Sequence, residues 1–277
     1  MSANKPVRTV QPNQPFSDWI GQLVSRRETL WFFIWKDLKV QYSKPIFGLL
    51  WSVFQPLVYF GIIFLVMRLS NRGGTSTEMP FALFLICGLT IWNFTTSGIL
   101  GSINSLQSNA GIISKSFFPR FYLILSPIIK SCLDLVIMLV IVIGFAIYLG
   151  QPITLKALVF IPISMILTVL STLGVGAVVA TLVIANRHVR HAIPVLLYAL
   201  IFVLPVFYSV NDINDSFIDM MYELNPIAGA MDCLRVAFGT ESPSYTTIAS
   251  WLVQSLIWLG VGVTLFKRTE KTLADRV

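Results

Sequence analysis

Charged residues divide this 277-residue chain into long uncharged windows and short charged segments. A helix needs roughly 20 apolar residues to cross a bilayer core of about 30 Å, and six windows without Asp, Glu, Lys or Arg reach that length. We therefore predict an all-α polytopic integral membrane protein with six transmembrane helices. The windows are Pro45–Met67, Met79–Ser114, Leu135–Leu155, Ala157–Asn186, Ala192–Asn211 and Ser242–Phe266.

The second window, of 36 residues, is longer than one span requires. Its last part, from Gly101 to Asn109, is rich in Ser, Asn and Gln. We expect the span to run from Phe81 to about Leu106 and the rest of the window to reach the cytosol.

Two further helical elements are predicted outside the windows. Apolar residues recur at helical spacing from Trp19 to Leu38 with basic residues between them, which predicts an N-terminal amphipathic helix in the membrane interface. A helix that packs on soluble protein is the alternative.

In the last outward loop, Leu224–Phe238 is too short and too charged to cross the bilayer, which favours a re-entrant or interfacial helical element. The predicted parts are a lead-in with the interface helix at 1–45, a transmembrane domain at 46–266 and a basic tail at 267–277.

Composition and charge placement narrow the class. Hydrophobic residues make up 55% of the chain and charged residues 12%, against about 25% charged in soluble domains, which excludes the soluble classes. With the N-terminus in the cytosol, 16 of the 20 Lys and Arg residues lie on the cytosolic side. This asymmetry predicts a multi-pass protein of the cytoplasmic (inner) membrane with both termini cytosolic. The net charge of +7 is then explained by topology, and no nucleic-acid partner is expected.

Several kinds of catalytic chemistry have no motif in the chain. It lacks a P-loop, a nucleotide-binding glycine fingerprint, H-E-x-x-H and G-x-S-x-G, so we expect no catalytic residue and no cofactor here. His188 and His191 have no Cys or carboxylate nearby in the sequence, and no metal site is expected. If the protein moves a substrate actively, the energy must come from another subunit.

Lys130 and Asp134 are four residues apart near the start of the third span. They are expected to pair with each other or to extend toward the interface, which would make them structural. A functional role is the alternative, because ionisable groups at membrane depth are costly.

Two short cytosolic segments are candidates for docking a partner. In the first, aromatic residues stand beside cations, a combination enriched at protein interfaces, although an ordinary membrane-interface anchor has the same composition. The second caps the fourth span. The candidate docking residues are Lys115, Phe117, Phe118, Pro119, Arg120, Arg187, His188, Arg190 and His191.

The chain after Trp19 resembles the membrane-spanning subunit of ABC-2 type exporters, in the branch that exports cell-surface polysaccharides. The resemblance rests on the order and spacing of short motifs. These are Lys36-Asp-Leu-Lys-Val-Gln-Tyr42, Gly48-Leu-Leu-Trp51 with Pro56, Phe118-Pro119-Arg120, Pro205-Val-Phe-Tyr208, Leu224-Asn-Pro226 with Arg235, and Phe266, Arg268, Glu270 and Ala274-Asp275. One departure is His188, where the family often has an acidic residue.

The resemblance implies a homodimer that associates with two copies of a nucleotide-binding subunit, which would bind ATP and Mg. It also implies export of an undecaprenyl-diphosphate-linked polysaccharide, with O-antigen expected ahead of teichoic acid or capsule. Lys36, Lys39, Tyr42 and Lys44 are then candidates for the lipid-diphosphate entrance, although positive-inside retention also explains the three lysines.

Aromatic faces suit sugar rings, so aromatic residues in the spans are candidates for lining the glycan path. Packing between spans is the alternative for each of them. The candidates are Tyr59, Trp92, Phe94, Phe207 and Tyr208. The resemblance makes Asn225, Pro226 and Arg235 candidates for an outer gate.

Three other functions stay open. One is an ABC-2 exporter of a drug or a lipid. A second is a polytopic glycosyl or acyl transferase, for which the acidic residues Asp212, Asp215, Asp219 and Glu223 of the outer loop are the candidate site. A passive channel fits least well, because no charged or carbonyl-rich filter motif occurs.

Overall fold

The computed structural model is all-helical in the residues that it describes. These are 16–42, 48–70, 79–113, 118–151, 153, 155–186, 188–209 and 216–270, and within them it has eleven helices and no strand. The predicted all-α class is confirmed. The helices are α1 (Phe16–Ser25), α2 (Arg27–Tyr42), α3 (Gly48–Leu69), α4 (Phe81–Ser108), α5 (Ala110–Ile113), α6 (Tyr122–Tyr148), α7 (Leu155–Ala185), α8 (Val189–Val203), α9 (Ser216–Glu223), α10 (Pro226–Val236) and α11 (Tyr245–Thr269).

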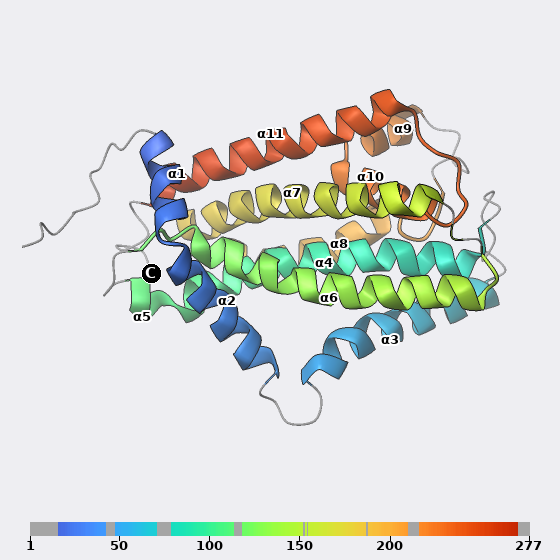
Figure 1. Ribbon diagram of the computed structural model, residues 1–277, viewed down its shortest axis with the longest axis horizontal. Helices are drawn as coiled ribbons and strands as arrows, with labels where there is room; N and C mark the ends of the chain where they lie inside the picture. Colours follow the sequence, from blue (N-terminus) through green and yellow to red (C-terminus); the bar gives the residue numbers. More distant parts are fainter. Residues whose placement is uncertain are drawn as a thin grey trace, which may run out of the picture.

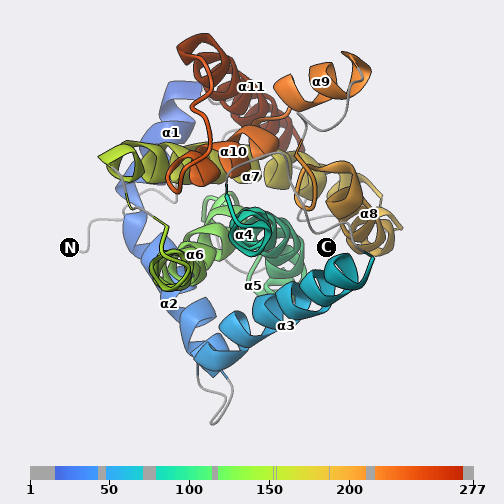
Figure 2. The ribbon, with the colours of Figure 1, turned by 90° about the vertical axis from the view of Figure 1, so that its right-hand side faces the viewer.

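Helix α4 lies at the centre of the bundle. The long helices α4, α6, α7 and α11 run side by side (Figure 1), and Figure 2 shows α4 end-on with α3, α6, α7, α8 and α10 around it. The start of α6 and the end of α11 lie at the same end of the molecule as α1. Because Arg26, Arg27, Arg120, Lys267 and Arg268 all belong to these segments, we call this end the basic end.

Four of the described helices are long and apolar enough to cross a membrane, namely α4, α6, α7 and α11. Helices α3 and α8 contain shorter apolar segments, Phe54–Leu69 and Val189–Val203. Six spans therefore stay a prediction. The third span begins earlier than its uncharged window, since α6 starts at Tyr122 and includes both Lys130 and Asp134. The sixth continues to Thr269, into the segment predicted as the tail.

The predicted N-terminal helix forms as two helices that meet at Arg26. Phe33 and Ile34 of α2 are buried in the protein, whereas Trp31 and Trp35 point outward and are 65% and 68% exposed. Polar residues of α2 also face the bundle, because the Ser126 hydroxyl of α6 donates to the Asp37 carboxylate at 2.9 Å. Helix α2 thus exposes large aromatic side chains together with charged residues such as Lys39, and it carries polar contacts on its packed side.

Glycines let α7 and α11 cross at close range. A Cβ on Gly174 would lie 2.5 Å from the carbonyl carbon of Trp258, and a Cβ on Gly262 would overlap the carbonyl oxygen of Gly174. Small residues allow such backbone approach between membrane helices, where packing rather than the hydrophobic effect holds helices together. The α7–α11 pair is therefore joined almost backbone to backbone.

Replacing Gly262 with alanine should destabilise the protein, whereas the same change at Gly260 should not. A Cβ at Gly260 meets nothing within 4 Å. Both variants place an alanine in α11, so they differ in the packing of the new methyl group alone. Overpacking typically costs about 1–3 kcal/mol. Thermal unfolding of the purified protein in detergent, followed by tryptophan fluorescence, should show a lower midpoint for Gly262→Ala alone. Equal unfolding midpoints for the two variants would show that α7 and α11 can move apart without loss of stability.

Candidate functional site

A single carboxylate joins three parts of the chain at the basic end. Glu270 accepts a hydrogen bond from the indole Nε1 of Trp19 at 3.0 Å and one from the backbone N–H of Arg120 at 2.7 Å. The guanidinium of Arg120 in turn donates to the backbone oxygen of Glu270. The ring of Phe121 lies 5.5 Å from that of Trp19 and 5.7 Å from that of Phe266. We call Trp19, Arg120, Phe121, Phe266 and Glu270 the Glu270 clasp.

The clasp includes part of the first candidate docking segment. Phe118 is half-buried with its ring 5.1 Å from that of Phe33, and Pro119 is buried. The guanidinium of Arg120 donates a hydrogen bond to the backbone oxygen of Glu270. These three residues thus fix the start of α6 against α2 and α11, while Lys115 and Phe117 lie outside the described residues. Their role in docking stays a prediction.

The second candidate docking segment joins α7 to α8. His188 and His191 are exposed and Arg190 is half-buried, while Arg187 lies outside the described residues. The backbone N–H of His188 donates to the Asn186 side chain at 3.0 Å. Among the described residues, no three His, Cys, Asp or Glu side chains gather as a metal site.

The candidate entrance residues differ in their surroundings. The ammonium of Lys36 donates to the side chain of Asn109, which is buried at the end of α4, and lies 5.7 Å from the Phe33 ring centre. Lys39 is exposed. Tyr42 ends α2, and nothing is described of its side chain; Lys44 lies outside the described residues. Lys39 is therefore the described lysine of this set that is open to a ligand.

Asp134 meets α2 rather than Lys130. The amide nitrogen of Gln41 lies 3.5 Å from both carboxylate oxygens of Asp134, and no ion pair joins Lys130 to Asp134 among the described residues. The Lys130–Asp134 pair that the spacing of four residues favoured therefore does not form. Helix α2 brings the Gln41 side chain to Asp134 instead.

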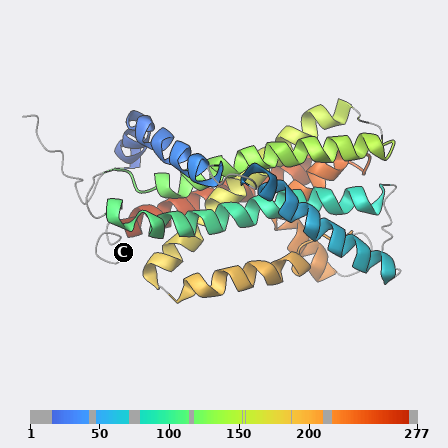
Figure 3. The ribbon, with the colours of Figure 1, turned by 90° about the horizontal axis from the view of Figure 1, so that it is seen from below.

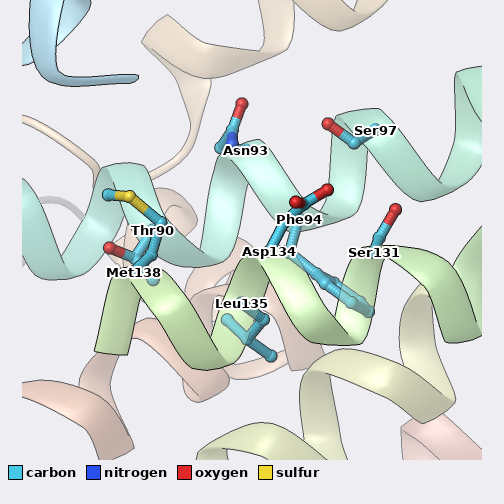
Figure 4. A pocket seen from close by; sticks show the side chains of 8 residues that line it. All are labelled: Thr90, Asn93, Phe94, Ser97, Ser131, Asp134, Leu135 and Met138. Carbon is cyan, nitrogen blue, oxygen red and sulfur yellow. The ribbon is translucent and has the colours of Figure 1, made fainter. Parts of the chain in front are cut away.

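Asp134 belongs to a small polar niche between α4 and α6 (Figure 4). Ser131 and Asp134 point from α6 toward α4, and Thr90, Asn93 and Ser97 come from successive turns of α4. Apolar side chains complete the lining: Phe94, Leu135 and Met138.

The five candidate aromatics do not form one exposed surface in this conformation. Tyr59 of α3 is 45% exposed, whereas Trp92, Phe94 and Phe207 are buried within the chain. The hydroxyl of Tyr208 donates to the carbonyl of Val203 at 2.5 Å. Lining of a glycan path by these rings stays a prediction.

The candidate outer-gate residues hold α10 inside the bundle. Asn225 caps α10, since its side-chain oxygen accepts hydrogen bonds from the N–H groups of Ile227 and Ala228, and Pro226 follows in the first turn. Ser164 of α7 donates to the carbonyl of Ala230 at 2.6 Å. Helix α10 is thus a short helix buried in the bundle, and its re-entrant or interfacial position stays a prediction.

Arg235 connects α10 to the end of α8. Its Nη2 donates to the carbonyls of Pro205 at 2.7 Å and Val206 at 3.3 Å, and its guanidinium carbon lies 3.4 Å from the centre of the Phe84 ring. A Cβ on Gly88 of α4 would lie 2.9 Å from Nη2, so glycine provides the room. These contacts satisfy carbonyls that the end of α8 leaves free.

Nearby, Tyr222 of α9 packs edge-on against the ring of Trp251 of α11, with 5.9 Å between ring centres. Burial, and then the neighbouring Asp232 carboxylate, raise the pKa of Tyr222 well above its ordinary value. The phenol thus stays neutral and protonated where α9, α10 and α11 meet.

Sequence reasoning missed the clasp. Glu270 entered only as part of a tail motif and Trp19 only as an apolar position of a helix. Their hydrogen bond joins residues 251 positions apart, which no periodicity reveals. The signal for Arg235 was stronger, because a lone arginine in a moderately apolar stretch must find acceptors when it is buried.

Replacing Arg235 with methionine should destabilise the protein by more than the same change at Arg68, which is exposed at the end of α3. The variant leaves two carbonyls without a donor, and a hydrogen bond to a charged group contributes about 1.5–3 kcal/mol. Thermal unfolding in detergent measures the difference. If both variants unfold like the parent, the carbonyls of Pro205 and Val206 do not depend on Arg235.

Comparison with known proteins agrees with the architecture. A family model described as "ABC-2 type transporter" matches residues 28–238. Two proteins of Klebsiella pneumoniae, each named "O-antigen export system permease protein RfbA", are 29% and 27% identical over 241 residues, covering 87% of this chain and 91% of theirs. A protein of the same name from Myxococcus xanthus is 22% identical over 260 residues, covering 93% of this chain and 98% of its own.

Proposed function

Because this chain belongs to the ABC-2 type transporter family, we propose that it is the permease subunit of an ABC exporter that moves O-antigen across the inner membrane. It is a multi-pass membrane protein and the transport subunit of its system. The single observation that supports O-antigen as the cargo is the similarity to O-antigen export permeases over nearly the full length of both chains.

The proposed topology has six spans and a cytosolic basic end. Helices α3 and α8 would be the first and fifth spans, beside the four longer helices. Clustering of Lys and Arg at one end supports its assignment to the cytosol. Both termini would then be cytosolic, and α9 and α10 would lie toward the opposite face.

The proposed assembly is a homodimer with two copies of an ABC ATPase, which would bind ATP and Mg. The sequence contains no P-loop, so hydrolysis belongs to the partner. The partner would dock at the segments around residues 114–121 and 186–191. Since the first segment leads into the Glu270 clasp, a push there would move α1, α6 and α11 together.

The proposed cargo is an undecaprenyl-diphosphate-linked polysaccharide. Lys39 is exposed on α2 at the basic end, where a cation would attract a lipid diphosphate. Lys36 is engaged by Asn109, so a diphosphate would have to compete for its ammonium. Lys44 completes the proposed entrance.

Co-expression with the ABC ATPase of an O-antigen exporter from the same organism tests the proposal. The pair should form a stable complex and restore surface O-antigen in a strain that lacks its own exporter. A complex that restores drug or lipid export instead would identify a different cargo. Restoration by this chain without any ATPase would contradict the ABC assignment, and a chain that restores export of no cargo would favour the transferase alternative.

Glu270→Ala should uncouple ATP hydrolysis from export. The variant removes the acceptor for Trp19 and for the backbone of Arg120, and it keeps every side chain that is proposed to contact the ATPase. Complex formation and basal ATPase activity should persist, and export should fall several-fold. Glu28→Ala, which removes an exposed carboxylate at the same end, is the control. Unchanged export in Glu270→Ala would show that the clasp does not transmit movement.

A further inference from the structure

Helix α4 has a polar exposed face although it lies at the centre of the bundle (Figure 2). Ser97, Asn104, Gln107 and Ser108 are exposed, and Asn93 and Thr96 are half-buried. No large hydrophobic side chain of α4 is exposed, whereas α3, α6, α8 and α11 all expose such side chains. The outward face of α4 is therefore unlike the lipid-compatible faces of its neighbours.

These polar residues recur at intervals of three, four and seven, which places them on one side of a helix. We call Asn93, Thr96, Ser97, Asn104, Gln107 and Ser108 the α4 polar stripe. In the view of Figure 3, the half of α4 toward the basic end lies between α6 and α8, and α3 crosses α4 farther along. The stripe ends at Asn93, since the residues from Phe84 to Trp92 are all buried.

The stripe retains free hydrogen-bonding capacity. The hydroxyls of Thr96 and Ser108 donate to backbone carbonyls one turn back. The side chains of Asn93, Ser97, Asn104 and Gln107 make no hydrogen bond with other described residues. At membrane depth, contact with acyl chains would leave Asn93 and Ser97 unsatisfied at a cost of several kcal/mol each. Water, a polar ligand or a second copy of the chain must meet them.

The niche at Asp134 extends this polar surface onto α6. Asn93 and Ser97 belong both to the stripe and to the niche lining, opposite Ser131 and Asp134 (Figure 4). The side-chain oxygen of Gln41, whose amide approaches Asp134, is buried without a partner. An unpaired buried acceptor on the residue that contacts Asp134 indicates a place for a donor from outside the chain.

We infer that the α4 polar stripe and the Asp134 niche line the path of the polysaccharide. The inference rests on the proposed function and assigns to it residues of α4 and α6. Hydroxyls and amides both donate and accept, as sugar hydroxyls do, so a glycan can exchange many similar hydrogen bonds as it moves. The stripe itself carries no charge, and no strong ion pair would hold the chain at one point.

Cysteine labelling tests the inference. The three native cysteines are replaced, and single cysteines are placed at Asn93, Ser97 or Asn104 in the complex with the ATPase. In membranes open at the cytosolic face, a membrane-impermeant maleimide should label the stripe positions several-fold faster than the matched controls at Leu65 and Val140. These controls are 56% and 64% exposed on apolar faces of α3 and α6.

Two outcomes would overturn the inference. Stripe cysteines that label as slowly as the controls would show that water does not reach them. Stripe cysteines that form disulfides between two copies of the chain would show that a second copy covers the face. Export of O-antigen by the same membranes is measured in parallel. If the stripe cysteines are not labelled but export is intact, the inference is wrong and the proposed function stands. If the parent complex does not export O-antigen, the proposed function is wrong.

A bulky side chain in the stripe provides the second test. Ser97→Phe should lower export several-fold while the complex and its basal ATPase activity persist, because the ring narrows the proposed path. Thr264→Phe, on an exposed position of α11, is the matched control and should leave export unchanged. Equal export by both variants would contradict the assignment of Ser97 to the path.

Discussion

The need to satisfy polar groups away from water is the constraint on which the structure depends. Within a bilayer core, each unpaired N–H or C=O costs several kcal/mol. Helix α8 ends at Val203, and the next carbonyls, of Pro205 and Val206, are met by Arg235. Helix α10 begins on the side chain of Asn225 and receives a hydrogen bond from Ser164. Irregular backbone between these helices is thus possible because specific side chains reach it.

The same constraint explains how much of the fold could be predicted. Uncharged windows follow directly from the cost of charge in lipid, so the helices α4, α7 and α11 fall close to their windows. The uncharged window alone begins later than α6, because Lys130 and Asp134 close the window although the helix begins at Tyr122. A charge inside a helix is tolerated when another helix brings a polar partner, and Gln41 of α2 is that partner for Asp134.

The candidate site was less predictable than the fold. Trp19 and Glu270 are at opposite ends of the sequence, and their contact depends on where α1 and α11 pack. Aromatic residues were chosen for their chemistry, but the burial of Trp92 and Phe94 depends on the position of α4 at the centre. The polar residues of α4 could be seen in the sequence only as a possible exit from the membrane. That these polar residues form the exposed face of α4 could be recognised only in the structure, where other helices cover the remaining sides of α4.

Direct contacts lead from the basic end to α10 at the other end of the bundle. Glu270 follows α11, which crosses α7 at Gly262 and Gly174 without intervening side chains. Farther along α11, Trp251 packs against Gly229 of α10, where a Cβ would overlap its ring. The α7–α11 crossing resists sliding, because no side chain lies between the two backbones, and Trp251 fits directly against the Gly229 backbone. Helix α11 therefore joins the Glu270 clasp to α10 rigidly, and a displacement at one end must be accommodated at the other.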